Sequence, residues 1–267
     1  MVQSVAPAAL LRRIYMRKPI AVLGVALAPV ALTAGVIAAA PQTADGAIAT
    51  YKLTYASLPN GTKQVVRWNG CQKTITYKVN LAAVPSAQRS AVLSDTKAAV
   101  AKVALNTKFV FTYKGTTSEV PKVGSMARQS AELVIAFTSP SKTNYSLAGS
   151  TLGQGGLYYG WVSRTVNGRT SYTVAAQRGF VVIDTPQMLN QARGGTGTGL
   201  RRTNLLAHEL GHAVGLQHVS DTRQQMYPSI RTASPTLFYT GDRAGLAKVG
   251  KAAGCINTAY MPLKDLS

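Results

Sequence analysis

Residues 208–218 read HELGHAVGLQH, and they constrain this chain more than any other stretch. Two of the histidines, His208 and His212, are four residues apart, so on a helix they lie one turn apart on the same face. Gly215 can adopt the backbone conformation that ends a helix and turns the chain. Three residues later, His218 can return to the same point. The spacing therefore predicts three imidazoles around one metal ion.

The three histidines of this motif are the only ones in the sequence. Three neutral nitrogen ligands leave the fourth position of a tetrahedral zinc ion open to water, as in catalytic zinc sites. Glu209 adjoins the first ligand without being one, and a carboxylate there can take a proton from the zinc-activated water. We therefore predict a hydrolase with one zinc ion held by His208, His212 and His218, and with Glu209 as general base.

The segment after the histidines carries a resemblance to a known family. His218 is followed by Val219, Ser220 and Asp221, and then by Met226, Tyr227 and Pro228. Together with the histidine motif, this pattern resembles that of the metzincin metalloproteases and, among them, the matrixins. The resemblance implies a zinc endopeptidase that acts on a protein or peptide substrate. It also implies that Met226 forms the Met-turn, an apolar floor under the zinc that is not a ligand.

The same resemblance implies a substrate site. An extended substrate would lie beside an edge strand at 156–161, and the segment at 227–239 would shape the pocket for the residue after the cut. The residues that we expect to bind substrate are Gly156, Leu157, Tyr158, Tyr227 and Pro228. The alternative for the aromatic-rich stretch at 156–161 is simple packing within a sheet.

Other metals receive little support from the residues. Matrixins often carry a second, structural zinc held by extra histidines, and this chain has none to spare, so we predict a single zinc. Calcium needs carboxylate and carbonyl oxygens. The nine acidic residues include no D-x-D cluster. Calcium could bind only through main-chain oxygens, and it is not predicted.

Two cysteines, Cys71 and Cys255, lie far apart in the sequence. In an exported protein an isolated pair most often forms a disulfide. The alternative is a Cys71 thiolate that blocks the metal, as in the pro-domain of matrixins. The surrounding sequence, WNGCQK, does not match the P-R-C-G pattern of that pro-domain. We therefore favour the disulfide.

The N-terminal residues have the pattern of an export signal. A basic start precedes an apolar run at 20–40, which ends in the small residues Ala38, Ala39 and Ala40 that offer a cleavage region. We predict a signal peptide at 1–44, a short, polar and poorly ordered segment at 45–66, and a catalytic domain at 67–267 of a secreted protein. The alternative is a protease anchored to the outer face of the membrane by residues 20–40, because about 20 apolar residues can span a bilayer.

The charge is strongly basic, with 29 Lys and Arg against 9 Asp and Glu. Such a surface favours an anionic cell-surface polymer as a partner. The basic residues are scattered, so we predict no specific nucleic-acid site. An alternative from another class is a basic module that binds cell wall or polysaccharide and holds only a structural zinc. Glu209 argues against that alternative, because a binder needs no carboxylate beside the ligand. We expect a monomer.

Periodicity predicts an α/β (α+β) fold of the zincin-like kind that the resemblance implies. We expect a mixed, twisted sheet of about five strands with two long helices. The active-site helix would be followed by the Met-turn and by a C-terminal helix at 238–250 with Asp242 as its cap. Predicted strands lie at 72–80, 108–113, 132–138 and 179–184, a hairpin turns at Asn167-Gly168, and a helix covers 86–106.

Overall fold

The computed structural model describes residues 50–124 and 128–261. These residues belong to one compact unit, Ala49–Ser267. The predicted signal peptide at 1–44 and the apolar stretch at 20–40 therefore lie outside the described residues. None of the described helices has the length and hydropathy that a membrane span requires.

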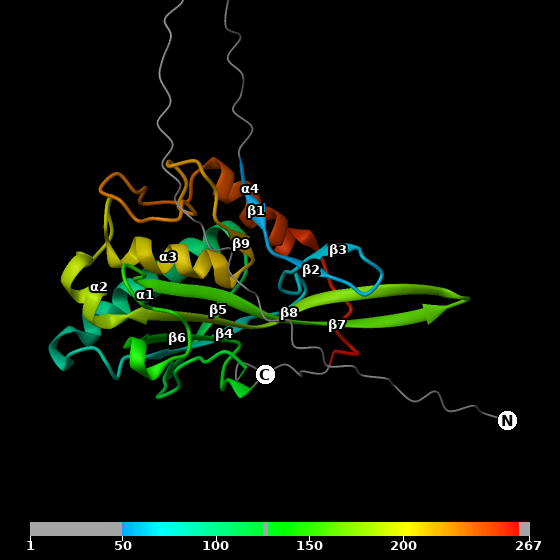
Figure 1. Ribbon diagram of the computed structural model, residues 1–267, viewed down its shortest axis with the longest axis horizontal. Helices are drawn as coiled ribbons and strands as arrows, with labels where there is room; N and C mark the ends of the chain where they lie inside the picture. The colour runs from blue at the N-terminus through cyan, green and yellow to red at the C-terminus, as the bar shows by residue number, and fades with distance from the viewer. Residues whose placement is uncertain (1–49, 125–127, 262–267) are drawn as a thin grey trace, which may run out of the picture. The chain divides into compact units, whose positions relative to one another are not determined.

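A five-stranded sheet with the strand order β5-β4-β6-β8-β7 forms the framework (Figure 1). Its strands are β4 (Ile75–Asn80), β5 (Phe111–Thr116), β6 (Leu133–Thr138), β7 (Gly153–Val166) and β8 (Arg169–Asp184). The first four in spatial order run parallel, and β7 pairs antiparallel with β8 at the edge. The α/β class with a mixed five-stranded sheet is confirmed.

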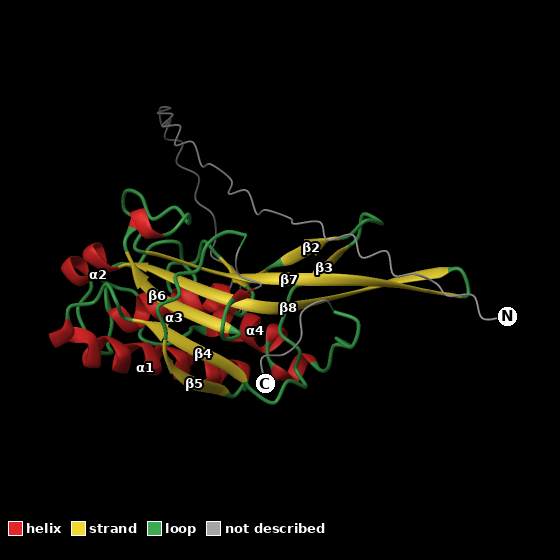
Figure 2. Ribbon diagram, turned by 90° about the horizontal axis from the view of Figure 1, so that it is seen from below, coloured by secondary structure: helices red, strands yellow, loops and turns green. Residues whose placement is uncertain are grey.

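Helices cover one face of this sheet (Figure 2). The α-helices of the described residues are α1 (Arg89–Thr107), α2 (Thr185–Gln191), α3 (Arg202–Ala213) and α4 (Thr240–Val249), with short 3₁₀ turns at Ser86–Gln88, Pro140–Lys142 and Lys251–Ala253. The two long helices, α1 and α3, pack against each other, and α3 also lies against β7 and β8. On the other face, Phe180 and Val182 pack with Leu147. Because both faces are covered, every residue of β6 is buried.

The hairpin predicted at Asn167-Gly168 joins the two longest strands. Asn167 has φ 49° and Gly168 has φ 72°. Positive φ at both central residues is what a two-residue turn of the I′ type requires, and Asn-Gly supplies it at little energetic cost. The strand predicted at 179–184 is the end of β8, which continues back to this turn.

Some predicted boundaries differ from the structure, and the strand predicted at 72–80 begins only at Ile75. The strand predicted at 108–113 begins three residues later, because Lys108 caps α1 in the left-handed region at φ 62° and Phe109 turns into the core. The sequence reading also missed α2, although its start signal is present. The Asp184 carboxylate accepts a hydrogen bond from Gln187 N at 3.2 Å, and Pro186 occupies the first turn.

The prediction of poor order at 45–66 is wrong for the described part of that segment. Three short strands lie there: β1 (Lys52–Leu53), β2 (Tyr55–Ser57) and β3 (Lys63–Val65). β2 and β3 pair with each other, and β1 pairs with β9 (Leu216–Gln217). Ala56 and Val66 are fully buried. These strands are too short to show periodicity; β2 and β3 form a local hairpin, and β1 is ordered by β9, which lies far away in the sequence.

The predicted disulfide is present between Cys71 and Cys255, whose Cα atoms are 4.8 Å apart. It closes a loop with a sequence separation of 184, which stabilises the fold by about 4–5 kcal/mol in the chain-entropy model. Asn69 supports the link, since its Oδ1 accepts hydrogen bonds from Cys71 N and Ile256 N. Cys71 is therefore a structural residue here and not a thiolate that blocks a metal.

Candidate metal centre

Helix α3 carries His208, Glu209 and His212 in its last two turns. The helix ends before Gly215, which has φ 114°, and a Cβ at that position would lie 2.9 Å from the carbonyl oxygen of Val66. Glycine is required there both for the turn and for this close approach. β9 then leads directly into His218, which returns to the two histidines of the helix.

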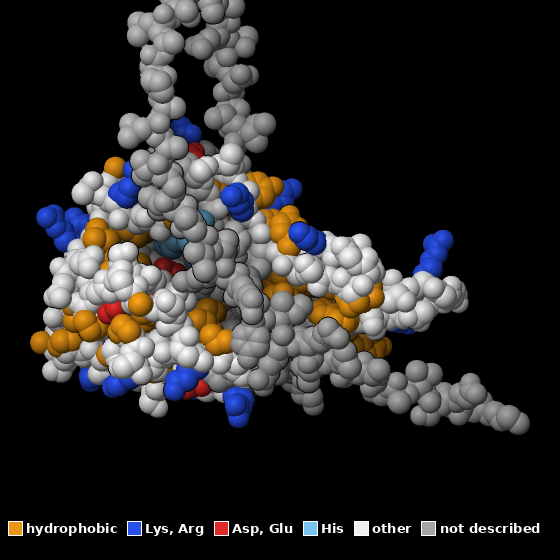
Figure 3. Space-filling view, in the orientation of Figure 1, with side chains coloured by type: hydrophobic (Ala, Val, Ile, Leu, Met, Phe, Trp, Pro, Cys, Tyr) orange, Lys and Arg blue, Asp and Glu red, His pale blue; other side chains and the backbone are white. Residues whose placement is uncertain are grey.

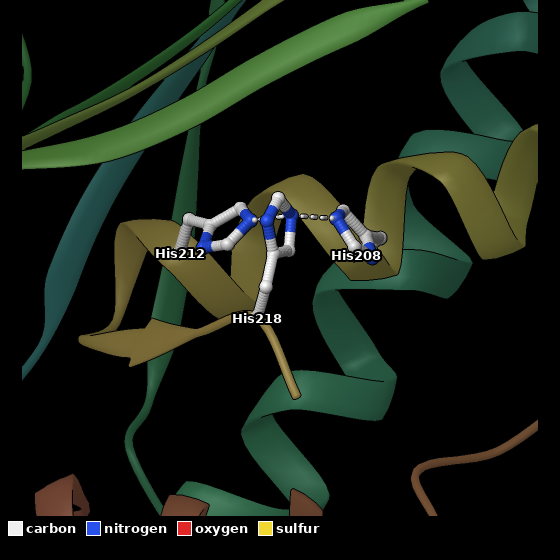
Figure 4. Close-up of side chains that lie close together, drawn as sticks. All are labelled: His208, His212 and His218. Carbon is white, nitrogen blue, oxygen red and sulfur yellow. Dashed lines mark hydrogen bonds between the residues drawn. The ribbon is translucent and has the colours of Figure 1, made fainter. Parts of the chain in front are cut away.

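The three rings point toward one another (Figure 4). His218 Nε2 lies 3.1 Å from His208 Nε2 and 3.0 Å from His212 Nε2. His208 Nδ1 lies 2.7 Å from the carbonyl oxygen of Gln225, and His212 Nδ1 lies 2.9 Å from that of Leu216. A carbonyl oxygen only accepts, so each of these Nδ1 atoms carries the proton. The Nε2 lone pairs of His208 and His212 are then directed into the space between the rings.

This arrangement fits a tetrahedral zinc ion. Ligand nitrogens at 2.0–2.1 Å from zinc are about 3.3 Å apart, close to the separations seen here. Burial lowers the pKa of His208 to about 4 and holds the pKa of His212 well below its usual value. Both imidazoles are therefore neutral at pH 7, which is the form that binds metal.

Access to the centre comes from the side of His218. Burial decreases along the ligand set, from a buried His208 through a half-buried His212 to an exposed His218. Histidine side chains are visible at the surface in Figure 3, beside an acidic side chain. Among the described residues, the three histidines are the one group of His, Cys, Asp or Glu close enough to share an ion.

Glu209 is only 6 % exposed and lies between α3 and the edge strand β7. A Cβ added to Gly153 would lie 3.1 Å from Glu209 Oε1, and one added to Gly155 would lie 1.9 Å from the carbonyl oxygen of Glu209. The glycines at the start of β7 therefore allow the active-site helix to touch the strand. This contact holds Glu209 against the face of β7 that is turned toward α3.

We expect Gly155→Ala to destabilise the fold by about 3 kcal/mol or more, because a Cβ that meets a backbone oxygen forces strand and helix apart. Gly160→Ala is the matched control. Its Cβ would meet only the flexible end of the Gln177 side chain, at 2.9 Å, so the expected loss is about 1 kcal/mol. Denaturant unfolding of both variants gives the comparison, and equal losses would contradict the packing argument.

Met226 packs against α3 at Gly211, and its role as the floor under the metal stays a prediction. It is 1 % exposed, and a Cβ at Gly211 would lie 2.4 Å from its sulfur. Its carbonyl oxygen accepts a hydrogen bond from Val219 N at 3.1 Å, which ties the turn to the residue after His218. Gly211 inside the histidine motif is therefore needed to make room for the methionine.

Asp242 is at the start of α4, as predicted, and it does more than cap that helix. Its carboxylate accepts hydrogen bonds from Gln225 N at 2.6 Å, Met226 N at 3.2 Å and Tyr239 N at 3.0 Å. Burial raises the pKa of Asp242, and the three N–H donors act in the opposite direction. The carbonyl oxygen of Gln225 also accepts a hydrogen bond from His208. Asp242 therefore orients the His208 ring through the main chain of Gln225.

The sequence reading missed Gln225 and Asn204, and no motif marked them. Gln225 is buried, and its side-chain nitrogen donates to the carbonyl oxygen of Asn204 at 2.9 Å. Asn204 in turn bonds to the main chain of Gly197 and Gly199. This network holds the segment at Gln225, which also bonds to His208, against the start of α3.

The predicted substrate residues lie on two elements. Gly156, Leu157 and Tyr158 are in β7, the edge strand of the sheet, and Tyr227 and Pro228 follow the Met-turn. The guanidinium carbon of Arg231 lies 4.9 Å from the centre of the Tyr227 ring. Contact with substrate remains a prediction for all five.

A comparison with known protein families agrees with this geometry. The family model described as Matrixin matches residues 67–249, a range that contains the whole sheet, the three histidines, Met226 and Asp242. No curated protein is similar enough to count as a match.

Proposed function

This chain belongs to the matrixin family of zinc metallopeptidases, and from that premise we propose that it cleaves internal peptide bonds with Glu209 as the general base. The observation that carries the proposal is the convergence of three imidazole nitrogens beside a buried carboxylate at a sheet edge. Protein or peptide is the substrate class that follows from the family.

His208, His212 and His218 hold the metal in this proposal. Zinc at that point supplies a Lewis acid that polarises the scissile carbonyl and makes water acidic enough to react near neutral pH. Glu209 takes the proton from the attacking water and returns it to the departing amine. Its burial against β7 excludes bulk water from the carboxylate and keeps it at one position.

The edge of β7 is the proposed place for the substrate main chain. Leu157 is the ladder partner of Gly179 in β8. The N–H of Gly179 donates at 2.7 Å to the carbonyl oxygen of Glu132, on the side of β8 away from β7. In an antiparallel ladder, both members of such a pair direct their main-chain groups away from each other. Leu157 therefore presents an N–H and a carbonyl at the open edge, where an extended peptide could add as a further strand. Tyr227 and Pro228 would shape the pocket after the cut.

Metal removal tests the proposal. We expect cleavage of casein or gelatin to stop when a chelator removes the metal and to return when one equivalent of zinc is added. The reason is that the three histidines lose their shared ion while the disulfide-linked fold persists. A chain that binds zinc tightly but cleaves nothing would instead be the binding module with a structural zinc.

Export is the proposed cellular context. The leader pattern at 1–44 supports it, and so does the Cys71–Cys255 disulfide, because disulfides persist in oxidising compartments. N-terminal sequencing of the mature protein tests this prediction. A start near 41–48 is expected for a secreted enzyme, and an intact Met1 would indicate the membrane-anchored form instead.

A further inference from the structure

The edge strand β7 continues well beyond the contact with α3. It has 14 residues, and among the described residues it pairs only with β8. Figures 1 and 2 show the β7–β8 hairpin extending past the helices. The burial of β7 falls from buried at Gly156 and Leu157 to exposed from Ser163 to Val166. An open edge therefore runs outward from the metal centre.

The hydrogen bonds of β8 show which groups of β7 face that edge. Three residues of β8 form main-chain hydrogen bonds on the side away from β7. The N–H groups of Gly179 and Ala176 donate to the carbonyl oxygens of Glu132 and Arg67. The carbonyl oxygen of Tyr172 accepts from the side chain of Gln64. Their ladder partners in β7 are Leu157, Tyr159 and Ser163. By the alternation of an antiparallel ladder, these residues and Trp161 present N–H and carbonyl groups outward, about 6.8 Å apart. The row is continuous with the proposed substrate edge at Leu157.

A buried amide lies beside this row. Gln177 is the extra residue of a bulge in β8, and it is 8 % exposed. Within the described part of the chain, neither its side-chain nitrogen nor its side-chain oxygen has a hydrogen-bond partner. Its carboxamide lies over Gly160, where a Cβ would be 2.9 Å from the Gln177 oxygen. Because Gly160 has no side chain, nothing in β7 separates this amide from a strand added at the edge.

The same face of the hairpin is basic at its far end. Arg164 is four residues from Gly160 and thus on its face, and Arg169 lies opposite Val166 on that face too. Both arginines are exposed. The acidic residue of β7 and β8 is Asp184, at the opposite end of β8. Figure 3 shows basic side chains on the projecting end.

We propose that the β7 edge from Tyr159 to Thr165 binds the part of the substrate upstream of the cleaved bond and selects acidic residues there. An added strand pairs more stably in the antiparallel sense, so upstream residues of the substrate run toward the hairpin tip. Gln177 hydrogen-bonds a polar side chain at the level of Gly160. Arg164 and Arg169 attract a carboxylate about seven residues upstream of the residue that faces Leu157, by register. The inference rests on the proposed function.

Peptides of two lengths test this. A short peptide spans the cut with three upstream residues, and two long peptides carry ten, with either Glu or Lys at the sixth to eighth upstream positions. We expect kcat/KM for the long Glu peptide to exceed that for the long Lys peptide about tenfold at low salt, and the ratio to fall as salt screens the charges. In R164E/R169E the preference should reverse, while cleavage of the short peptide is unchanged.

A second variant tests the main-chain contacts. Ser163→Pro removes an outward N–H without breaking a bond to β8, and Ser163→Ala is its control. The proline variant should lose the advantage of the long Glu peptide over the short one, and the alanine variant should keep it. Equal cleavage of all three peptides, or a dependence on downstream residues instead, overturns the inference but not the peptidase. Failure to cleave any peptide rejects the proposed function and this extension with it.

Discussion

Replacing Glu209 with glutamine is expected to lower kcat/KM by about 10²–10⁴, while the protein keeps its zinc. Glutamine has the same shape as glutamate, so the contact with Gly153 and Gly155 survives, and the three histidines keep their positions. The amide cannot accept a proton from water, and removing a general base typically costs a factor in this range. Peptide cleavage and metal content measured on one preparation give both numbers.

Glu119→Gln is the matched control for that experiment. Glu119 bonds to Ser130 in another part of the fold, so the same chemical change there should leave kcat/KM and zinc content unchanged. If Glu209→Gln cleaved at the wild-type rate, Glu209 would not be the base. If it lost zinc as well as activity, the carboxylate would have a role in holding the metal site.

Asp242→Ala is expected to destabilise the protein by about 3–5 kcal/mol, because two buried N–H donors and one partly buried donor lose their acceptor, and each buried donor costs about 1–3 kcal/mol when left unpaired. The donors belong to Gln225, Met226 and Tyr239. Zinc affinity should fall as well, by about 10–100-fold, since the carbonyl that orients His208 loses its support. Denaturant unfolding with and without chelator separates the two effects.

Asp221→Ala serves as the comparison for Asp242. Asp221 bonds mainly to the side chain of the exposed Arg223, and surface pairs of this kind contribute at most about 1 kcal/mol. A loss for Asp242→Ala as small as that for Asp221→Ala would show that the Met-turn does not depend on this carboxylate.

The sequence predicts the metal centre better than its surroundings, and the reason is locality. His208 and His212 are related by one helical turn, and Gly215 returns the chain within a few residues, so spacing alone brings the ligands together. The Asn167-Gly168 turn is local in the same way. Each of these features depends on residues that are neighbours in the sequence.

The features that the sequence did not reveal depend on distant partners. β1 is ordered by pairing with β9, the strand before His218. The support of His208 passes through Gln225 to Asp242, which lies 17 residues further along the chain. The glycines at the start of β7 resemble a loop in sequence, yet they are required because α3 lies against them. None of these contacts produces a periodic pattern or a motif in the sequence.

X-ray absorption at the zinc edge tests the central claim most directly, because it reports the ligands of the metal in the intact protein. We expect one zinc per chain with three imidazole nitrogens at about 2.0–2.1 Å and an oxygen in the remaining position. In His218→Ala the zinc should be lost or the nitrogen count should fall to two. A sulfur ligand at about 2.3 Å, or an unchanged spectrum in His218→Ala, would contradict a catalytic centre built from His208, His212 and His218.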